Sequence, residues 1–184
     1  MLRRTHSLVA PLLLWLWLAP STAHAFERQW HLGGGAGVTS FAHDYKLGPA
    51  LGLNAAYGLS DMFDARVELL GSTHVLSSPL FANLPQTRAE LFTASAGVTY
   101  KLDVLQWIPY KNVLVGYRHV AGALSPTAEY RRDDLAAGIL LGLDYSASRS
   151  FGLGLSWRGD SALSKLSATE SMTLMLRAEY HWGF

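Results

Sequence analysis

Seven histidines and one glycine-rich run are the first places in this chain to look for chemistry. The histidines show no His-x-x-x-His pair or other ligand spacing, and the chain has no Cys to supply a thiolate. Neither a transition-metal site nor thiolate catalysis is therefore predicted. The run Gly33-Gly34-Gly35-Ala36-Gly37 has strand periodicity and opens no helix, so it indicates close strand packing rather than phosphate binding. No cofactor is predicted.

The segment from Gly116 to Gly122 (GYRHVAG) places a histidine on a predicted strand. It resembles the active-site strand of the lipid A 3-O-deacylases, eight-stranded barrels in which a strand His, a Ser two residues later and an orienting acid act together. His119 matches the His, but Ala121 stands where the family has its Ser nucleophile. Ser125 and Asp133 are nearby, neither at the family's spacing. Since this mechanism starts from a hydroxyl, no catalytic residue is predicted, and a lipid A-modifying enzyme is kept as an alternative.

The elements that position these residues are predicted from a hydrophobic period of two. The pattern is clearest at the end of the chain, where apolar and other residues alternate: Met172, Leu174, Leu176, Ala178, Tyr180, Trp182 and Phe184 against Thr173, Met175, Arg177, Glu179, His181 and Gly183. It recurs near residues 28–39, 49–59, 62–74, 90–102, 112–123, 134–145 and 150–159. The chain is therefore predicted to be all-β, with eight antiparallel strands in an up-and-down transmembrane barrel.

The two faces of the predicted strands differ in a way that assigns the inside. One face is aliphatic and aromatic, and the other is rich in Gly, Ala, Ser and Thr, with few of the surface Lys and Glu of a soluble barrel. Small residues fit a narrow eight-stranded lumen, and large apolar ones fit a lipid-facing band. The charges predicted in the lumen, five of each sign, are Asp64, Glu68, Asp134, Asp144 and Glu179 with Arg66, Lys101, Arg118, Arg158 and Arg177. Equal numbers allow pairing, which favours a closed, salt-bridged interior over the alternative of a narrow pore.

The connections orient the barrel. Short ones are predicted at Ser60-Asp61 and Ser146–Arg149, together with Asp103–Lys111, which holds Trp107, Pro109 and Tyr110. Longer ones at 40–48, 75–89, 124–133 and 159–169 are assigned to the outside, and 75–89 holds Leu80, Phe81 and Leu84 in the open. Aromatic residues then fall at the periplasmic strand ends, where they are predicted to form a girdle: Trp30, Tyr57, Phe63, Tyr100, Tyr110, Tyr145, Phe151, Tyr180 and Trp182.

The N-terminus predicts secretion. Arg3 and Arg4 precede an apolar run from Leu8 to Leu18, and Ala23-His24-Ala25 has the small-x-small form of a cleavage site. Residues 1–25 are therefore predicted to be a signal peptide and residues 26–184 the barrel domain. Removing both arginines leaves 13 Lys and Arg against 14 Asp and Glu, so the composition does not suggest nucleic-acid binding.

Composition agrees with a membrane barrel. Hydrophobic residues make up 49% of the 184 residues and charged residues 16%, yet no apolar run has the roughly 20 residues of a spanning helix. With the terminal Phe184 after alternating Tyr180 and Trp182, the chain resembles small outer-membrane barrels of the OmpA/OmpX type. That resemblance implies Phe184 as part of a signal for the barrel-assembly machinery, lipopolysaccharide and outer-membrane lipid as surroundings, and a monomer. The function expected is non-enzymatic, either stabilising the Gram-negative envelope or contacting a partner through outer loops.

Overall fold

The computed structural model describes residues 28–41, 47–76, 87–102, 106–125, 128–165 and 171–183. The predicted signal peptide, Phe184, and the segment that holds Leu80, Phe81 and Leu84 lie outside the described residues. The strands are β1 (Trp30–Phe41), β2 (Leu47–Gly58), β3 (Phe63–Leu76), β4 (Thr87–Lys101), β5 (Trp107–Ser125), β6 (Ala128–Ser148), β7 (Phe151–Ala162) and β8 (Ser171–Trp182), with a short 3-10 helix, η1 (Leu163–Lys165), before β8.

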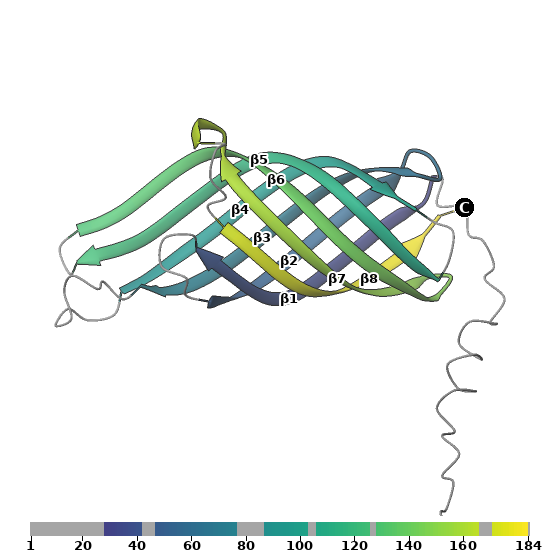
Figure 1. The fold of residues 1–184 in the computed structure, drawn as a ribbon, viewed down its shortest axis with the longest axis horizontal. Helices are drawn as coiled ribbons and strands as arrows, with labels where there is room; N and C mark the ends of the chain where they lie inside the picture. Colours follow the sequence, from purple (N-terminus) through teal and green to yellow (C-terminus); the bar gives the residue numbers. More distant parts are fainter. Residues whose placement is uncertain are drawn as a thin grey trace, which may run out of the picture.

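These strands close into one barrel in sequence order (Figure 1). Each strand is antiparallel to the next, and β1 pairs with β8 from Trp30 opposite Trp182 to Phe41 opposite Ser171. Closure lets backbone N–H and C=O groups satisfy one another around the wall, as a membrane requires. The predicted eight-stranded antiparallel barrel is confirmed. Among the described residues, no helix is long and apolar enough to cross a membrane.

Side chains alternate between a lipid-type exterior and a polar interior. Large apolar residues such as Leu51, Val113 and Leu176 are exposed on the outside, whereas charged residues and hydroxyls are buried inside. This is the reverse of a water-soluble barrel, and it follows from the period of two because neighbouring side chains on a strand point to opposite faces. The exterior is therefore suited to acyl chains and the interior to polar contacts.

The lumen also holds an apolar layer that was not predicted. Leu114 and Leu140 pack with Tyr110, and Leu70 packs with Met175. These side chains lie on the same inward face of their strands as the charged residues. They fill part of the narrow lumen with apolar groups, so this part needs neither water nor counter-charges.

Strands β5 and β6 begin or end well outside their predicted bounds. Trp107 to Tyr110, expected in a turn, form the start of β5, and most of the expected loop 124–133 belongs to the two strands. The girdle assignment of Tyr110 is wrong: parity turns it inward, where it is 7% exposed. Gly142 lies opposite Tyr110 in register, and a Cβ there would overlap the Tyr110 ring unless that side chain moved.

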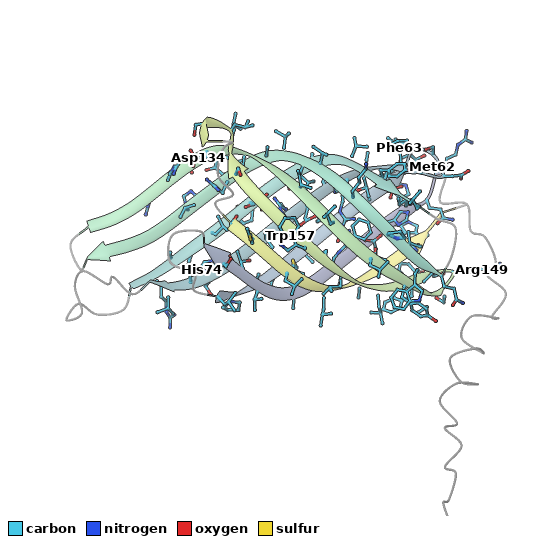
Figure 2. All side chains as sticks on the ribbon, viewed as in Figure 1. Met62, Phe63, His74, Asp134, Arg149 and Trp157 are labelled. Atoms are coloured by element: carbon cyan, nitrogen blue, oxygen red, sulfur yellow. The ribbon has the colours of Figure 1, made fainter. Side chains whose placement is uncertain are left out.

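The two ends of the barrel differ. The turn end carries the short connections, including Leu59–Met62 and Arg149–Ser150, and the end of β8 (Figure 1). Phe63 and Arg149 lie at this end in Figure 2, whereas His74 and Asp134 lie toward the opposite, loop end. Short turns face the periplasm in bacterial barrels, so the loop end is the extracellular one.

The β5–β6 hairpin projects beyond the other strands at the loop end (Figure 1). Only two residues separate its strands, and pairing runs out to Ser125 opposite Ala128. Strand β7 pairs with β6 only from Ala136 onward, so within the described part of the chain β6 has no β7 partner for residues 128–135. The hairpin therefore presents a stretch of strand edge outside the barrel wall.

Candidate functional site

A connected set of ion pairs occupies the middle of the lumen. Arg158 on β7 makes a two-pronged contact with Asp160, Nη2 to Oδ1 at 2.7 Å and Nε to Oδ2 at 2.8 Å. The same guanidinium donates Nη1 to Glu68 Oε1 on β3 at 3.0 Å. Glu68 continues to Arg66, with Oε2 at 3.6 Å from Nε. Side chains from opposite walls meet in this way because the barrel is only about wide enough for them.

Glu179 on β8 connects this set to the turn end. Its Oε2 accepts Arg177 Nη2 at 2.6 Å and Asn54 Nδ2 at 3.1 Å, and lies 3.8 Å from Arg66 Nη2. Its Oε1 lies 3.1 Å from His31 Nδ1 and 3.4 Å from His181 Nε2. Thus one oxygen of the carboxylate is fixed by cations and an amide, and the other faces two imidazoles.

Arg177 has partners besides Glu179. It donates hydrogen bonds to the Tyr110 hydroxyl and, at 3.2 Å, to Asn54 Oδ1. Its Nη1 lies 3.9 Å from Asp144 Oδ2 on β6. Strands β2, β5, β6 and β8 are therefore tied together through one guanidinium, whose planar fork suits several acceptors at once.

Three further ion pairs lie near the ends of the lumen. Lys101 Nζ is 2.9 Å from Asp64 Oδ1 toward the turn end. Toward the loop end, Arg118 Nη2 lies 3.3 Å from Asp134 Oδ2, which also accepts Arg132 Nε at 2.7 Å. Register places Arg118 opposite Asp134 on the neighbouring strand, so this pair lies nearer the loop end than the Arg158 contacts.

The structure places all ten predicted lumen charges on the inside, each within an ion pair: Asp64, Arg66, Glu68, Lys101, Arg118, Asp134, Asp144, Arg158, Arg177 and Glu179. Asp160 and Arg132 were not predicted in the lumen. The seventh strand was expected to end near residue 159 and the sixth to begin near residue 134, so both residues fell outside the predicted strands. They add one charge of each sign. The interior is filled by paired groups, which leaves an ion few unpaired charges to bind along the axis.

The predicted girdle residues other than Tyr110 surround the turn end. Four ring pairs touch, with centroids 4.9 Å apart for Trp30 and Tyr57, 5.3 Å for Phe63 and Tyr100, 5.0 Å for Trp107 and Tyr145, and 5.9 Å for Tyr180 and Trp182. Phe151 lies opposite Tyr180 in register. Strand pairing thus brings aromatic rings from neighbouring strands to one level, which suits the headgroup region.

A polar cluster lies on the outer face of β5 and β6 near the loop end. His119 Nδ1 is 2.6 Å from Asp133 Oδ1, and the Tyr117 hydroxyl donates to the same oxygen. Asp133 was set aside because its spacing did not match. The strand pairing nevertheless brings it opposite His119, 14 residues away in sequence. An acid therefore orients the histidine, while the position two residues on is still Ala121, so the cluster has a base and lacks the hydroxyl nucleophile of the deacylase pattern.

Comparison with solved structures finds barrels of this kind. Ail, the attachment invasion locus protein of Yersinia pestis, is 14% identical, with a TM-score of 0.61 over 85% of this chain and 99% of that chain. The outer membrane protein OprG from Pseudomonas aeruginosa is 11% identical, with a TM-score of 0.64 over 88% and 99%. Neisserial surface protein A is 15% identical, with a TM-score of 0.57 over 85% and 97%.

The fold is that of the small outer-membrane β-barrels. Together with the apolar exterior, this fold makes the protein an integral outer-membrane β-barrel. No protein-family model matches the chain, and no curated protein matches its sequence. At these identities the likeness concerns the fold, so a more specific role has to be argued from the residues.

Proposed function

We propose that the protein is a non-enzymatic surface protein of the outer membrane that contacts a partner through extracellular elements, above all the β5–β6 hairpin. The observation that carries the proposal is the projection of this hairpin past the rest of the wall (Figure 1). A barrel that served only to fill the membrane would have no need of strands of 19 and 21 residues beside neighbours of 12 to 15.

The hairpin has features suited to binding. Arg131 and Asp133 are exposed on its outward side, above the apolar belt that ends at Tyr117 and Leu135. The edge of β6 over residues 128–135 offers backbone groups to which an extended segment of another protein can add as a strand. Ail and Neisserial surface protein A bear names that describe an attachment protein and a surface protein, which agrees with a surface role.

A lipid A-modifying enzyme is the second candidate, and the His119–Asp133 pair favours it. The histidine is half-exposed near the outer membrane surface, where lipid A lies, and is oriented by a carboxylate. The argument against it is Ala121, since acyl transfer needs a nucleophile that the base can deprotonate.

One strain comparison tests both candidates. Residues 119–133 are replaced by Asn-Gly, which joins the register partners Arg118 and Asp134 through a tight turn and removes Arg131, Asp133 and most of the free β6 edge. Attachment to cultured cell monolayers is the readout, because the name of Ail describes an attachment protein. We expect cells with the wild-type protein to attach, and cells with the shortened hairpin to attach as little as cells without the protein. The lipid A mass profile should be the same in all three strains.

Heat-modifiable migration on gels is the control that the shortened barrel still folds. Undiminished attachment by the shortened variant would overturn the hairpin proposal. Loss of an acyl chain from lipid A that depends on the protein, and that His119→Ala abolishes, would replace it with the enzyme.

A further inference from the structure

Two histidines and a glutamate converge inside the lumen near the turn end. His31 on β1 and His181 on β8 are register partners across the seam that closes the barrel, and their rings lie 4.4 Å apart. Glu179 shares the inward face of β8 with His181, two residues away. One donor atom from each of the three residues lies within 4.8 Å of the others. The sequence shows no ligand spacing for this set, because the two histidines are 150 positions apart and only closure of the barrel brings them together.

The carboxylate is already turned toward the imidazoles. Arg177 at 2.6 Å and Asn54 at 3.1 Å fix Glu179 Oε2, which leaves Oε1 between His31 Nδ1 and His181 Nε2. In metal sites, groups behind the ligands orient them in this manner and raise affinity. Arg177 and Asn54 therefore hold the Glu179 carboxylate in one orientation, with Oε1 toward the two rings.

The distances suit a small divalent ion. Zinc binds His nitrogen and carboxylate oxygen at about 2.0–2.2 Å, so two donors of a tetrahedral site lie about 3.3–3.6 Å apart. The separations of Oε1 from the two imidazole nitrogens are 3.1 and 3.4 Å. All three donor atoms lie within 4.8 Å of one another, so binding an ion would also require the two imidazole nitrogens to come within about 3.3–3.6 Å of each other.

A cavity adjoins the three donors. It measures about 30 Å³ and is lined by His31, Glu179 and His181 together with Asp64, Asp144 and Ser146. Its wall also holds two cations, Arg66 and Lys101, which are paired with Glu68 and Asp64. Such a volume holds about two water-sized groups, enough for an ion and a water in the fourth position. Tyr145 and Ser146 on its wall lie at the turn end of β6, so the periplasm is the side from which an ion would enter.

We propose that His31, Glu179 and His181 bind one divalent first-row transition metal ion, zinc or a close relative, and that the ion links β1 to β8. Two imidazoles and one carboxylate, without a thiolate, are a donor set that such ions accept. Each ring must offer a nitrogen that carries no proton, so a hydrogen that an imidazole donates to Glu179 Oε1 has to move to the other nitrogen of that ring or be released. The carboxylate stays charged and offsets part of the charge of the ion.

The test is a zinc titration of the folded, tag-free protein in detergent after treatment with a chelator. We expect one saturable zinc ion per chain by calorimetry, and at least about 100-fold weaker binding in both His31→Ala and His181→Ala. His74→Ala is the matched control, since His74 is another buried lumen histidine but lies toward the loop end. It should bind zinc as the wild type does, and so should His119→Ala, which removes the histidine of the outer face.

A second measurement separates metal loss from misfolding. Zinc should raise the urea midpoint of the wild-type protein and leave that of the His31→Ala/His181→Ala variant unchanged, since a ligand stabilises only the state that binds it. Heat-modifiable migration confirms that each variant is folded. Absence of saturable binding in the wild type, or equal binding in the folded double variant, would overturn the proposal. Loss of the ion on His119→Ala would also overturn it, because the site would then lie on the outer face.

Discussion

Glu179 is the shared hydrogen-bond and ion-pair partner of two groups of lumen residues, the cations with Asn54 on one side and the two histidines on the other. Its two oxygens contact Arg177, Arg66, Asn54, His31 and His181, and the side chain is almost wholly buried. Charged groups in a confined interior are tolerated when they are paired, and the larger cost comes from removing one partner of a pair. Removal of this one carboxylate should therefore destabilise the folded barrel.

Glu179→Ala should lower the free energy of unfolding by about 3–5 kcal/mol, because Arg177 and Arg66 lose a counter-charge inside the barrel. Urea unfolding in detergent micelles with a chelator present measures this without any contribution from metal. Glu90→Ala is the control, since Glu90 is an exposed carboxylate on β4 and its loss should change stability by about 0.5 kcal/mol or less. Equal stability of the two variants would show that the lumen charges are not coupled.

At the scale of the strands, the sequence predicts a large part of the structure. Parity alone places Arg66, Glu68 and Arg158 inside and Leu141 outside, because a strand allows no other arrangement once one face is assigned. Parity does not determine which side chains meet across a pair of strands. The meeting of His31 with His181 and of His119 with Asp133 depends on register, which the alternation of side chains leaves open.

Strand ends were the other point that the sequence left undetermined. Tyr110 was assigned to the girdle because aromatic residues near a proline suggest an interfacial turn. Pairing with β6 instead carries β5 through Pro109 and turns Tyr110 into the lumen. Tertiary pairing also extended β5 and β6 into a segment whose polar residues had suggested a loop.

The outward face of β6 allows a prediction of how stability depends on the depth of a residue in the membrane. Leu141 is 48% exposed and lies four residues from the girdle residue Tyr145 toward the middle of the strand. Leu141→Arg should cost about 2–4 kcal/mol, as expected for a cation near the bilayer midplane. Leu153→Arg is the control: Leu153 is 49% exposed but lies opposite Tyr145 at the girdle, where the cost should fall to about 0–1 kcal/mol.

Reversible folding into lipid vesicles gives both values. A cost for Leu141→Arg no larger than that for Leu153→Arg would mean that the apolar belt is not centred where the girdle places it. Trp157, the register partner of Leu141, lies midway along the barrel in Figure 2, between Arg149 at the turn end and His74 toward the loop end.

The described part of the molecule is a short cylinder with an apolar wall and a filled axis, and its β5–β6 hairpin projects beyond the other strands (Figure 1). Eight strands enclose a space about wide enough for side chains, whereas the water-filled channels of porins need 16 to 18. Here Arg158, Glu68 and Asp160 cross the axis from β7 and β3, with Leu70, Leu114 and Leu140 packed in the same interior. A solute moving along the axis would have to break ion pairs and displace apolar side chains together.

Purified protein in planar bilayers should therefore show no stable open level, and a 16-stranded porin reconstituted in the same way serves as the positive control. The reason is electrostatic as well as steric. An ion entering the lumen exchanges its hydration shell for groups already bound to one another, such as Arg158 with Asp160 and Arg177 with Glu179. Reproducible open levels from heat-modifiable wild-type protein would contradict the closed lumen. If they disappeared when the same preparation was unfolded, a narrow pore would replace the hairpin-based surface protein as the first candidate function.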